Sequence, residues 1–198
     1  EIHERLVGSE MCIRDSSEPA PLATKESTRP EYAEHEVGMI PQLAARFETA
    51  AQLPGAEYLA KLRYLILPIR EADAVPQPLR CKTLLELPRA AFGTVEPDTM
   101  RRLAALEGSD FAGVVANNLA QFGYASPLPV FGGLGLNVTN PMSAAEYVCL
   151  GACGLLVQPE TALTAMRAVA PRQKDGTPVP TAALCYGHLP LMLTLSLI

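Results

Sequence analysis

The stretch that decides the fold is residues 128–160, LPVFGGLGLNVTNPMSAAEYVCLGACGLLVQPE. An apolar run over 129–136 gives way to the polar letters NVTN, and a segment with helical spacing follows over 143–150. A second apolar run, 154–157, ends in QPE. The order is therefore strand, polar tip, helix, strand, polar tip. Parallel α/β folds bind their ligands at the carboxyl ends of the strands, so this stretch indicates both a fold and the place of a site.

Apolar runs on either side of this stretch predict further strands, with helices between them. Strands are expected at 44–48, 64–68, 83–87, 113–116 and 181–185, and helices at 50–62, 96–108 and 162–169. Within 143–150, Ser143 and Glu146 have the spacing of a capping box. Strands that are apolar on both faces and alternate with amphipathic helices indicate a parallel sheet covered by helices. We expect an incomplete (β/α)8 TIM-barrel-like fold, with an open doubly wound sheet as the alternative.

The composition excludes several classes of protein. The chain has 198 residues, 48% of them hydrophobic and 19% charged, which is enough apolar material for one packed domain. A net charge of -5 argues against a broad nucleic-acid-binding face, and no apolar run approaches the ~20 residues of a membrane span. Five scattered cysteines without a secretion signal favour reduced thiols and a cytoplasmic location.

The two ends of the chain differ from its middle. Residues 1–16 include LVGSEMCIRDS, which is similar to translated sequencing-adapter sequence, and 195–198 is similar to the start of such a segment. The alternative for 1–16 is a natural charged tail. Residues 17–42 are rich in Pro, Glu, Ala, Ser and Thr, which is typical of a linker. The domain itself is expected at 43–194.

Seven polar side chains lie at or just after the ends of the predicted strands. They are Glu86, Asn117, Asn137, Asn140, Glu160, Tyr186 and His188. A parallel sheet brings such residues to one edge, so together they form the candidate site. Glu160 and His188 are the candidate catalytic groups, because a carboxylate or an imidazole can act as a general base. The other five are candidate substrate-binding residues.

Some of these residues also have a purely structural interpretation. Asn140 is well placed to cap a helix that begins with Pro141. Glu160 can complement a helix dipole, and a single histidine such as His188 is often structural. Asn137 ends a deeply apolar run, so its amide is expected to be buried among partners inside the barrel mouth.

The cysteines do not define a metal site. Cys149 and Cys153 are four apart and can share a helix face, but two thiols need further ligands, and the alternative is that they behave as small buried hydrophobes. Cys185 is expected in the core. We therefore assign no metal ligands and no cofactor from the sequence.

Five stretches occur in an order that resembles a known family. They are LELPR (85–89), VVANNLAQF (114–122), LGLNVTNPMSAAEYVCLGA (134–152), LLVQPE (155–160) and YGHLPLMLT (186–194). Together they resemble the peptidase U-32 family, the collagenase-like peptidases, and most closely the second barrel module of its long bacterial members. The resemblance runs from about Phe47 to Thr194 and implies a TIM-barrel-like fold. The family commonly has aspartate where Gly133 stands, serine at Gln158, and arginine or lysine at His188.

The resemblance implies two classes of activity and leaves both open. The family label implies a peptide-bond hydrolase, although no nucleophile is evident here. Related members act in iron–sulfur-dependent hydroxylation of RNA bases or quinone precursors, and none of the five cysteines matches a cluster position of the family. A third possibility is a non-catalytic barrel that supports other modules of a parent chain. The implied partners are a peptide or RNA substrate and those modules, with no membrane.

Overall fold

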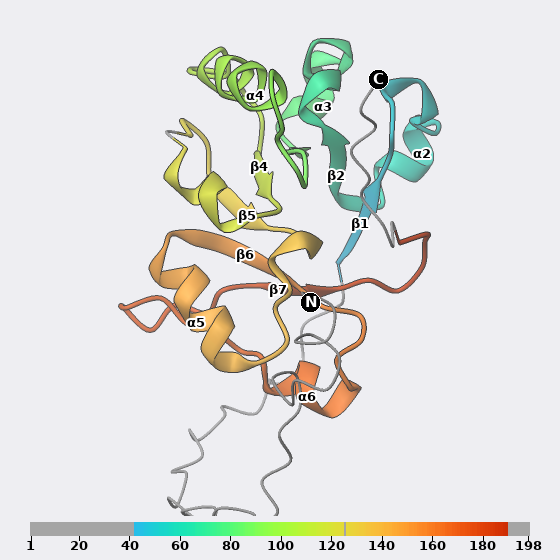
Figure 1. Cartoon of the computed structure of the whole chain (residues 1–198). Helices are drawn as coiled ribbons and strands as arrows, with labels where there is room; N and C mark the ends of the chain where they lie inside the picture. The colour runs from blue at the N-terminus through green and yellow to red at the C-terminus, as the bar shows by residue number, and fades with distance from the viewer. Residues whose placement is uncertain (1–41, 125, 190–198) are drawn as a thin grey trace, which may run out of the picture. The chain divides into compact units, whose positions relative to one another are not determined.

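Seven parallel strands form one sheet in the computed structural model, which describes residues 42–124 and 126–189 (Figure 1). The strands are β1 (Leu43–Arg46), β2 (Leu62–Pro68), β3 (Thr83–Glu86), β4 (Gly113–Ala116), β5 (Val130–Gly132), β6 (Ala152–Val157) and β7 (Thr181–Ala183). Their order in the sheet is their order in the chain, and every neighbouring pair is parallel. The sheet curls into a half-barrel whose edges are β1 and β7.

This strand order decides between the two predicted topologies. A doubly wound sheet reverses its strand order at a switch point, whereas these strands follow one another in a single direction. The prediction of a parallel α/β fold is confirmed, and the doubly wound alternative is wrong. The predicted segments 1–16 and 195–198, and all of the 17–42 linker except Gln42, lie outside the described residues.

Short helices connect the strands. They are the 3-10 helices η1 (Ala50–Gln52), η2 (Ile69–Ala74), η3 (Leu119–Gly123) and η4 (Leu134–Leu136), and the α-helices α2 (Ala56–Leu59), α3 (Gln77–Arg80), α4 (Val95–Ala104), α5 (Pro141–Cys149) and α6 (Leu163–Ala168). The predicted helix over 50–62 is not continuous: only 50–52 and 56–59 are helical. Pro54 and Gly55 separate η1 from α2, because proline and glycine disfavour a helix interior, and the last predicted residue, Leu62, instead begins β2.

The predicted apolar strand over 129–136 is also shorter than expected. β5 ends at Gly132, and Gly133 N donates to Ala116 O at 2.7 Å as the chain turns into η4. The predicted capping box is wrong as well. α5 begins at Pro141, and the Asn140 side chain accepts a hydrogen bond from Ser143 N at 2.9 Å, so Asn140 is the N-cap.

The two faces of the sheet are packed differently. One face carries Leu67, Leu85 and Val114, which are buried against the connecting helices. Side chains alternate along a strand, so Val115 and its register partner Phe131 point to the opposite, inner face. There the rings of Phe131 and Tyr64 are 5.7 Å apart. Phe131 therefore fills the concave side of the curled sheet.

Gly113 makes room for this ring. A Cβ at position 113 would lie 2.8 Å from Phe131 Cε2 and 2.6 Å from Pro129 O. We predict that Gly113→Ala lowers the free energy of unfolding by about 1–3 kcal/mol, the usual cost of overpacking. Urea denaturation measures this cost. The control is Gly55→Ala, where a Cβ has no neighbour within 4 Å. Equal stabilities of the two variants would contradict the prediction.

Candidate functional site

A buried asparagine organises the carboxyl edge of the sheet. Asn117 directly follows β4 and is 2% exposed. Its Nδ2 donates to Leu87 O at 2.9 Å and to Glu86 Oε1 at 3.2 Å, while its Oδ1 accepts from Gly135 N at 3.2 Å. One side chain thus joins the end of β3, the end of β4 and η4.

A second buried amide, that of Gln121 in η3, extends this network. Gln121 Oε1 accepts from Asn117 N at 2.6 Å, and its Nε2 donates to Pro88 O at 2.7 Å. Asn118 caps η3 by accepting from Gln121 N at 3.1 Å. Gln121 was not among the predicted site residues, although Asn118 and Gln121 have capping-box spacing.

Glu86 connects this network to β1. The Glu86 side chain is 17% exposed, and its Oε2 accepts from Arg46 Nε at 2.6 Å. Arg46 also donates through Nη1 to Glu48 Oε1 at 2.6 Å, and Arg70 lies 3.6 Å from the other Glu48 oxygen. Arg46 was not among the predicted site residues, because it lies in a short strand with no motif around it.

Arg46 and Glu48 each stabilise the charged form of the other. Burial by itself lowers the pKa of Arg46, but the bonds and charges of Glu48 and Glu86 outweigh it and raise that pKa above its usual value. The hydrogen bond from Arg46 lowers the pKa of Glu48. Arg46 therefore stays cationic and Glu48 anionic at neutral pH, and the carboxyl edge keeps a fixed pattern of charges.

Asn137 does not occupy the predicted position. It was expected to be buried, but it is exposed, because β5 ends five residues earlier and η4 carries the chain outward. Its φ of 54° is left-handed, a conformation that asparagine tolerates better than most residues. Val138 bridges to Val157 in parallel, so Asn137 and Glu160 still lie at the same carboxyl end of β6, as predicted.

The remaining predicted site residues are dispersed. Asn140 is the N-cap of α5, which confirms its structural interpretation and occupies its Oδ1. Glu160, Tyr186 and His188 are exposed, and none forms a hydrogen bond or ion pair with another described residue. Of the seven candidates, the structure directly connects Glu86 and Asn117.

The thiols also differ from expectation. α5 ends at Cys149 and β6 begins at Ala152, so Cys149 and Cys153 do not share a helix face. Cys149 and Cys185 are exposed free thiols rather than buried core residues. Among residues 42–124 and 126–189, no three His, Cys, Asp or Glu side chains are grouped to hold a metal ion. No helix in this part of the chain is long and apolar enough to cross a membrane.

The chain was compared with protein-family models, with curated proteins and with solved structures. No family model and no curated protein matches the chain. Among solved structures, the chain is similar to the U32 peptidase Mk0906, with a TM-score of 0.46 and 13% sequence identity over 68% of this chain and 70% of the other.

Two glycines leave space for the Asn117 side chain. A Cβ at position 133 would clash with Asn117 Oδ1, and a Cβ at 135 would clash with the Asn117 backbone. We predict that Gly133→Ala lowers the free energy of unfolding by about 1–3 kcal/mol. The cost should shrink by at least about 0.5 kcal/mol in an Asn117→Ala background, because the clashing oxygen is gone. A double-mutant cycle in urea measures the coupling, and strictly additive costs would contradict the contact.

Proposed function

We propose that this chain is part of a U-32-type barrel and binds a peptide at the carboxyl edge of its sheet. The observation that carries the proposal is the Arg46–Glu86–Asn117 network, which holds a partly exposed carboxylate in one orientation. The ordered resemblance of five sequence stretches to the U-32 family supports the assignment. In this proposal, an eighth strand completes a (β/α)8 barrel between β7 and β1.

The chemistry of the network suits a peptide backbone. Glu86 accepts one hydrogen bond on each oxygen, and each carboxylate oxygen has capacity for another. The Arg46 side chain is 46% exposed and carries five N–H donors. A peptide unit offers one N–H and one C=O. Glu86 can accept from the N–H while Arg46 donates to the C=O, and charged partners strengthen both bonds.

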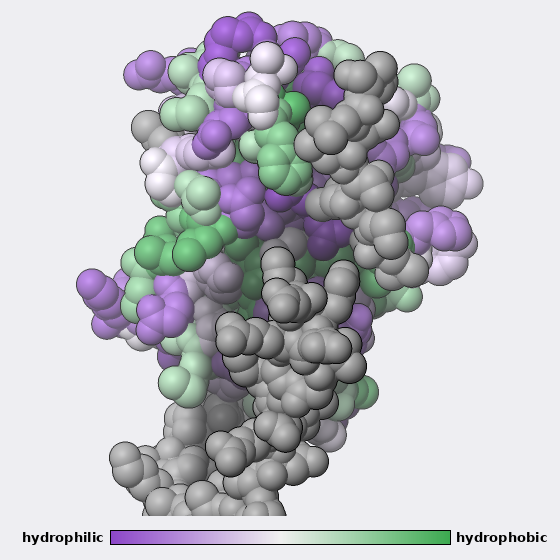
Figure 2. Space-filling model, viewed as in Figure 1, coloured by the Kyte–Doolittle hydropathy of each residue, from purple (hydrophilic) through white to green (hydrophobic). Residues whose placement is uncertain are grey.

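Apolar side chains at the same edge offer contacts for peptide side chains. The helices η3, α5 and α6, which lie between β4, β5 and β6 and the strand that follows each, have an exposed apolar residue at their first or second position. These are Leu119, Met142 and Leu163, which are 61%, 79% and 64% exposed. Figure 2 shows hydrophobic residues exposed among hydrophilic ones on one face of the molecule. Such mixed surfaces are typical of binding sites that combine apolar contact with a few polar anchors.

Hydrolysis of a peptide bond would require further chemical groups at this edge. Amide cleavage needs an activated nucleophile or a metal-bound water, together with donors for the oxyanion. If the barrel does hydrolyse peptides, we propose Glu160 as the general base and His188 as a further catalytic group. The substrate-binding residues in that proposal are Asn137, Asn140 and Tyr186. Because Glu160 and His188 share no contact among the described residues, binding is the activity proposed for this chain on its own.

We predict that Glu86→Gln weakens peptide binding about tenfold, because the variant loses the negative charge that orients Arg46 and accepts the peptide N–H. Fluorescence anisotropy with labelled gelatin-derived peptides measures the dissociation constant, and circular dichroism checks the fold. The matched control is Glu107→Gln, an exposed glutamate after α4. An equal effect of both variants, or binding to an oligoribonucleotide and not to peptides, would refute the proposal.

We predict that the chain alone does not cleave gelatin or a peptide library, with or without added divalent metal or iron. A displacement of catalytic groups by about 1 Å can cost about a hundredfold in rate, and here the candidate groups are not held together. Mass spectrometry of the incubated peptides detects any product. Turnover that Glu160→Gln abolishes in a folded variant would show that the chain is itself a peptidase.

A further inference from the structure

A hollow of about 560 Å³ lies at the amino-terminal end of β6, away from the carboxyl edge. The six residues of β6 separate the two ends by roughly 17 Å, at about 3.3 Å per residue. One wall is the end of α5 and the start of β6, and the other is the turn 172–175. Its volume falls within the range of small-molecule sites, about 300–1,000 Å³.

The turn that forms the second wall is fixed by its own hydrogen bonds. Arg172 pairs with Pro178 in an antiparallel bridge, and Gln173 N donates to Thr177 O at 2.9 Å. Asp175 Oδ1 accepts from Thr177 N at 2.9 Å, and this backbone bond lowers the pKa of Asp175. The turn is therefore built before any ligand arrives.

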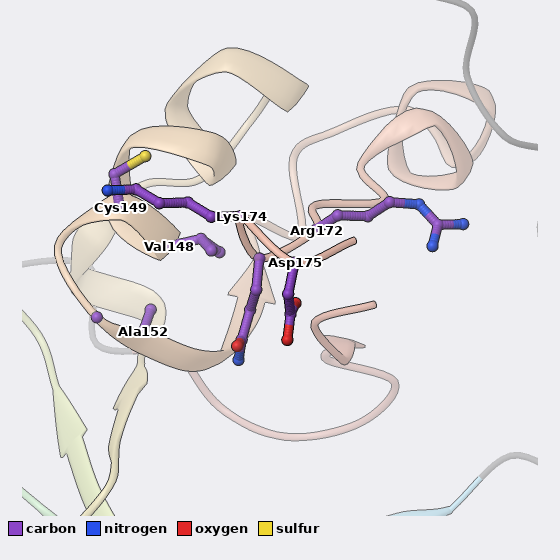
Figure 3. A pocket seen from close by; sticks show the side chains of 8 residues that line it. Val148, Cys149, Ala152, Arg172, Lys174 and Asp175 are labelled. Carbon is purple, nitrogen blue, oxygen red and sulfur yellow. The ribbon is translucent and has the colours of Figure 1, made fainter. Parts of the chain in front are cut away.

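Three charged side chains of this turn line the hollow, and they are held differently. Arg172 Nη1 donates to Gly176 O at 2.9 Å, and in Figure 3 its side chain points away from Cys149. The Asp175 carboxylate accepts one backbone hydrogen bond and remains an exposed anion. Lys174 forms no hydrogen bond or ion pair with another described residue, and Figure 3 shows it extending towards Cys149 on α5. The lining therefore holds two cations and one anion and is net positive, and Lys174 is its cation without a described partner.

The opposite wall is apolar. Ala152 is 2% exposed, and Val148 is half-buried beside it. Gly151, between α5 and β6, has a φ of 102°, and a Cβ there would have no neighbour within 4 Å. The hollow therefore combines a largely apolar wall with a facing turn of net positive charge.

We propose that this hollow binds a small organic carboxylate, with the ammonium of Lys174 pairing with the carboxylate and Val148 contacting the apolar body. The pairing follows from charge and shape: an anion offsets the net positive charge of the turn, and an apolar body removes the remaining exposed surface of Val148 from water. This site is separate from the carboxyl edge and does not depend on peptide binding there.

The test is a ¹⁵N NMR titration of the full chain with benzoate, with benzylamine as the probe of opposite charge. Benzoate should shift the Gly151, Ala152 and Lys174 amide signals saturably at low millimolar concentration, and benzylamine should leave them in place. Lys174→Gln should weaken benzoate binding about tenfold. The matched control, Lys61→Gln, removes an exposed lysine elsewhere and should bind as the unmodified chain does.

Three results would overturn the proposal. The first is the absence of saturable shifts at these residues, and the second is equal binding of benzoate and benzylamine. The third is equal benzoate affinity of the Lys174→Gln and Lys61→Gln variants. The comparison of benzoate with benzylamine uses the unmodified chain. It therefore tests whether the hollow prefers a carboxylate even if the Lys174→Gln variant does not fold.

Discussion

The buried amide of Asn117 is the interaction on which the carboxyl edge depends. An unpaired amide at this depth would cost about 1–3 kcal/mol, so each of its polar atoms must find a partner. The partners come from β3, from the residues after it, and from η4. Glycine at positions 133 and 135 lets η4 approach closely enough to provide one of them. The early end of β5 and the outward course of the chain at Asn137 follow from this arrangement.

The same amide determines how Glu86 is presented. Asn117 fixes one carboxylate oxygen and Arg46 the other, so a side chain with several rotatable bonds is held at the edge of the sheet. Arg46 and Glu48 are substantially exposed, and solvent screening makes such pairs weak contributors to stability. Their importance lies in orientation: they set which donors and acceptors a bound molecule meets.

The two ends of β6 have different chemical character. At its carboxyl end, Glu160 is exposed on a turn close to the Val138–Val157 bridge. At its amino end, a hydrogen-bonded turn with Arg172, Lys174 and Asp175 faces a largely apolar wall across a hollow. One short strand thus separates an edge that carries Glu160 from a hollow whose lining is net positive.

The sequence by itself determined the parallel α/β class and the place of the polar edge. Apolar runs followed by polar tips are a local signal, because burial on both faces selects the residues within each strand. Strand 113–116 was predicted with its observed bounds, and Glu86 and Asn117 were placed correctly at strand ends. Only the tertiary structure decided that these two side chains meet, that Gln121 and Arg46 join them, that Asn137 faces outward, and that Glu160 and His188 share no contact. The physical reason is that these outcomes depend on hydrogen bonds between residues up to 40 positions apart, which local periodicity does not encode.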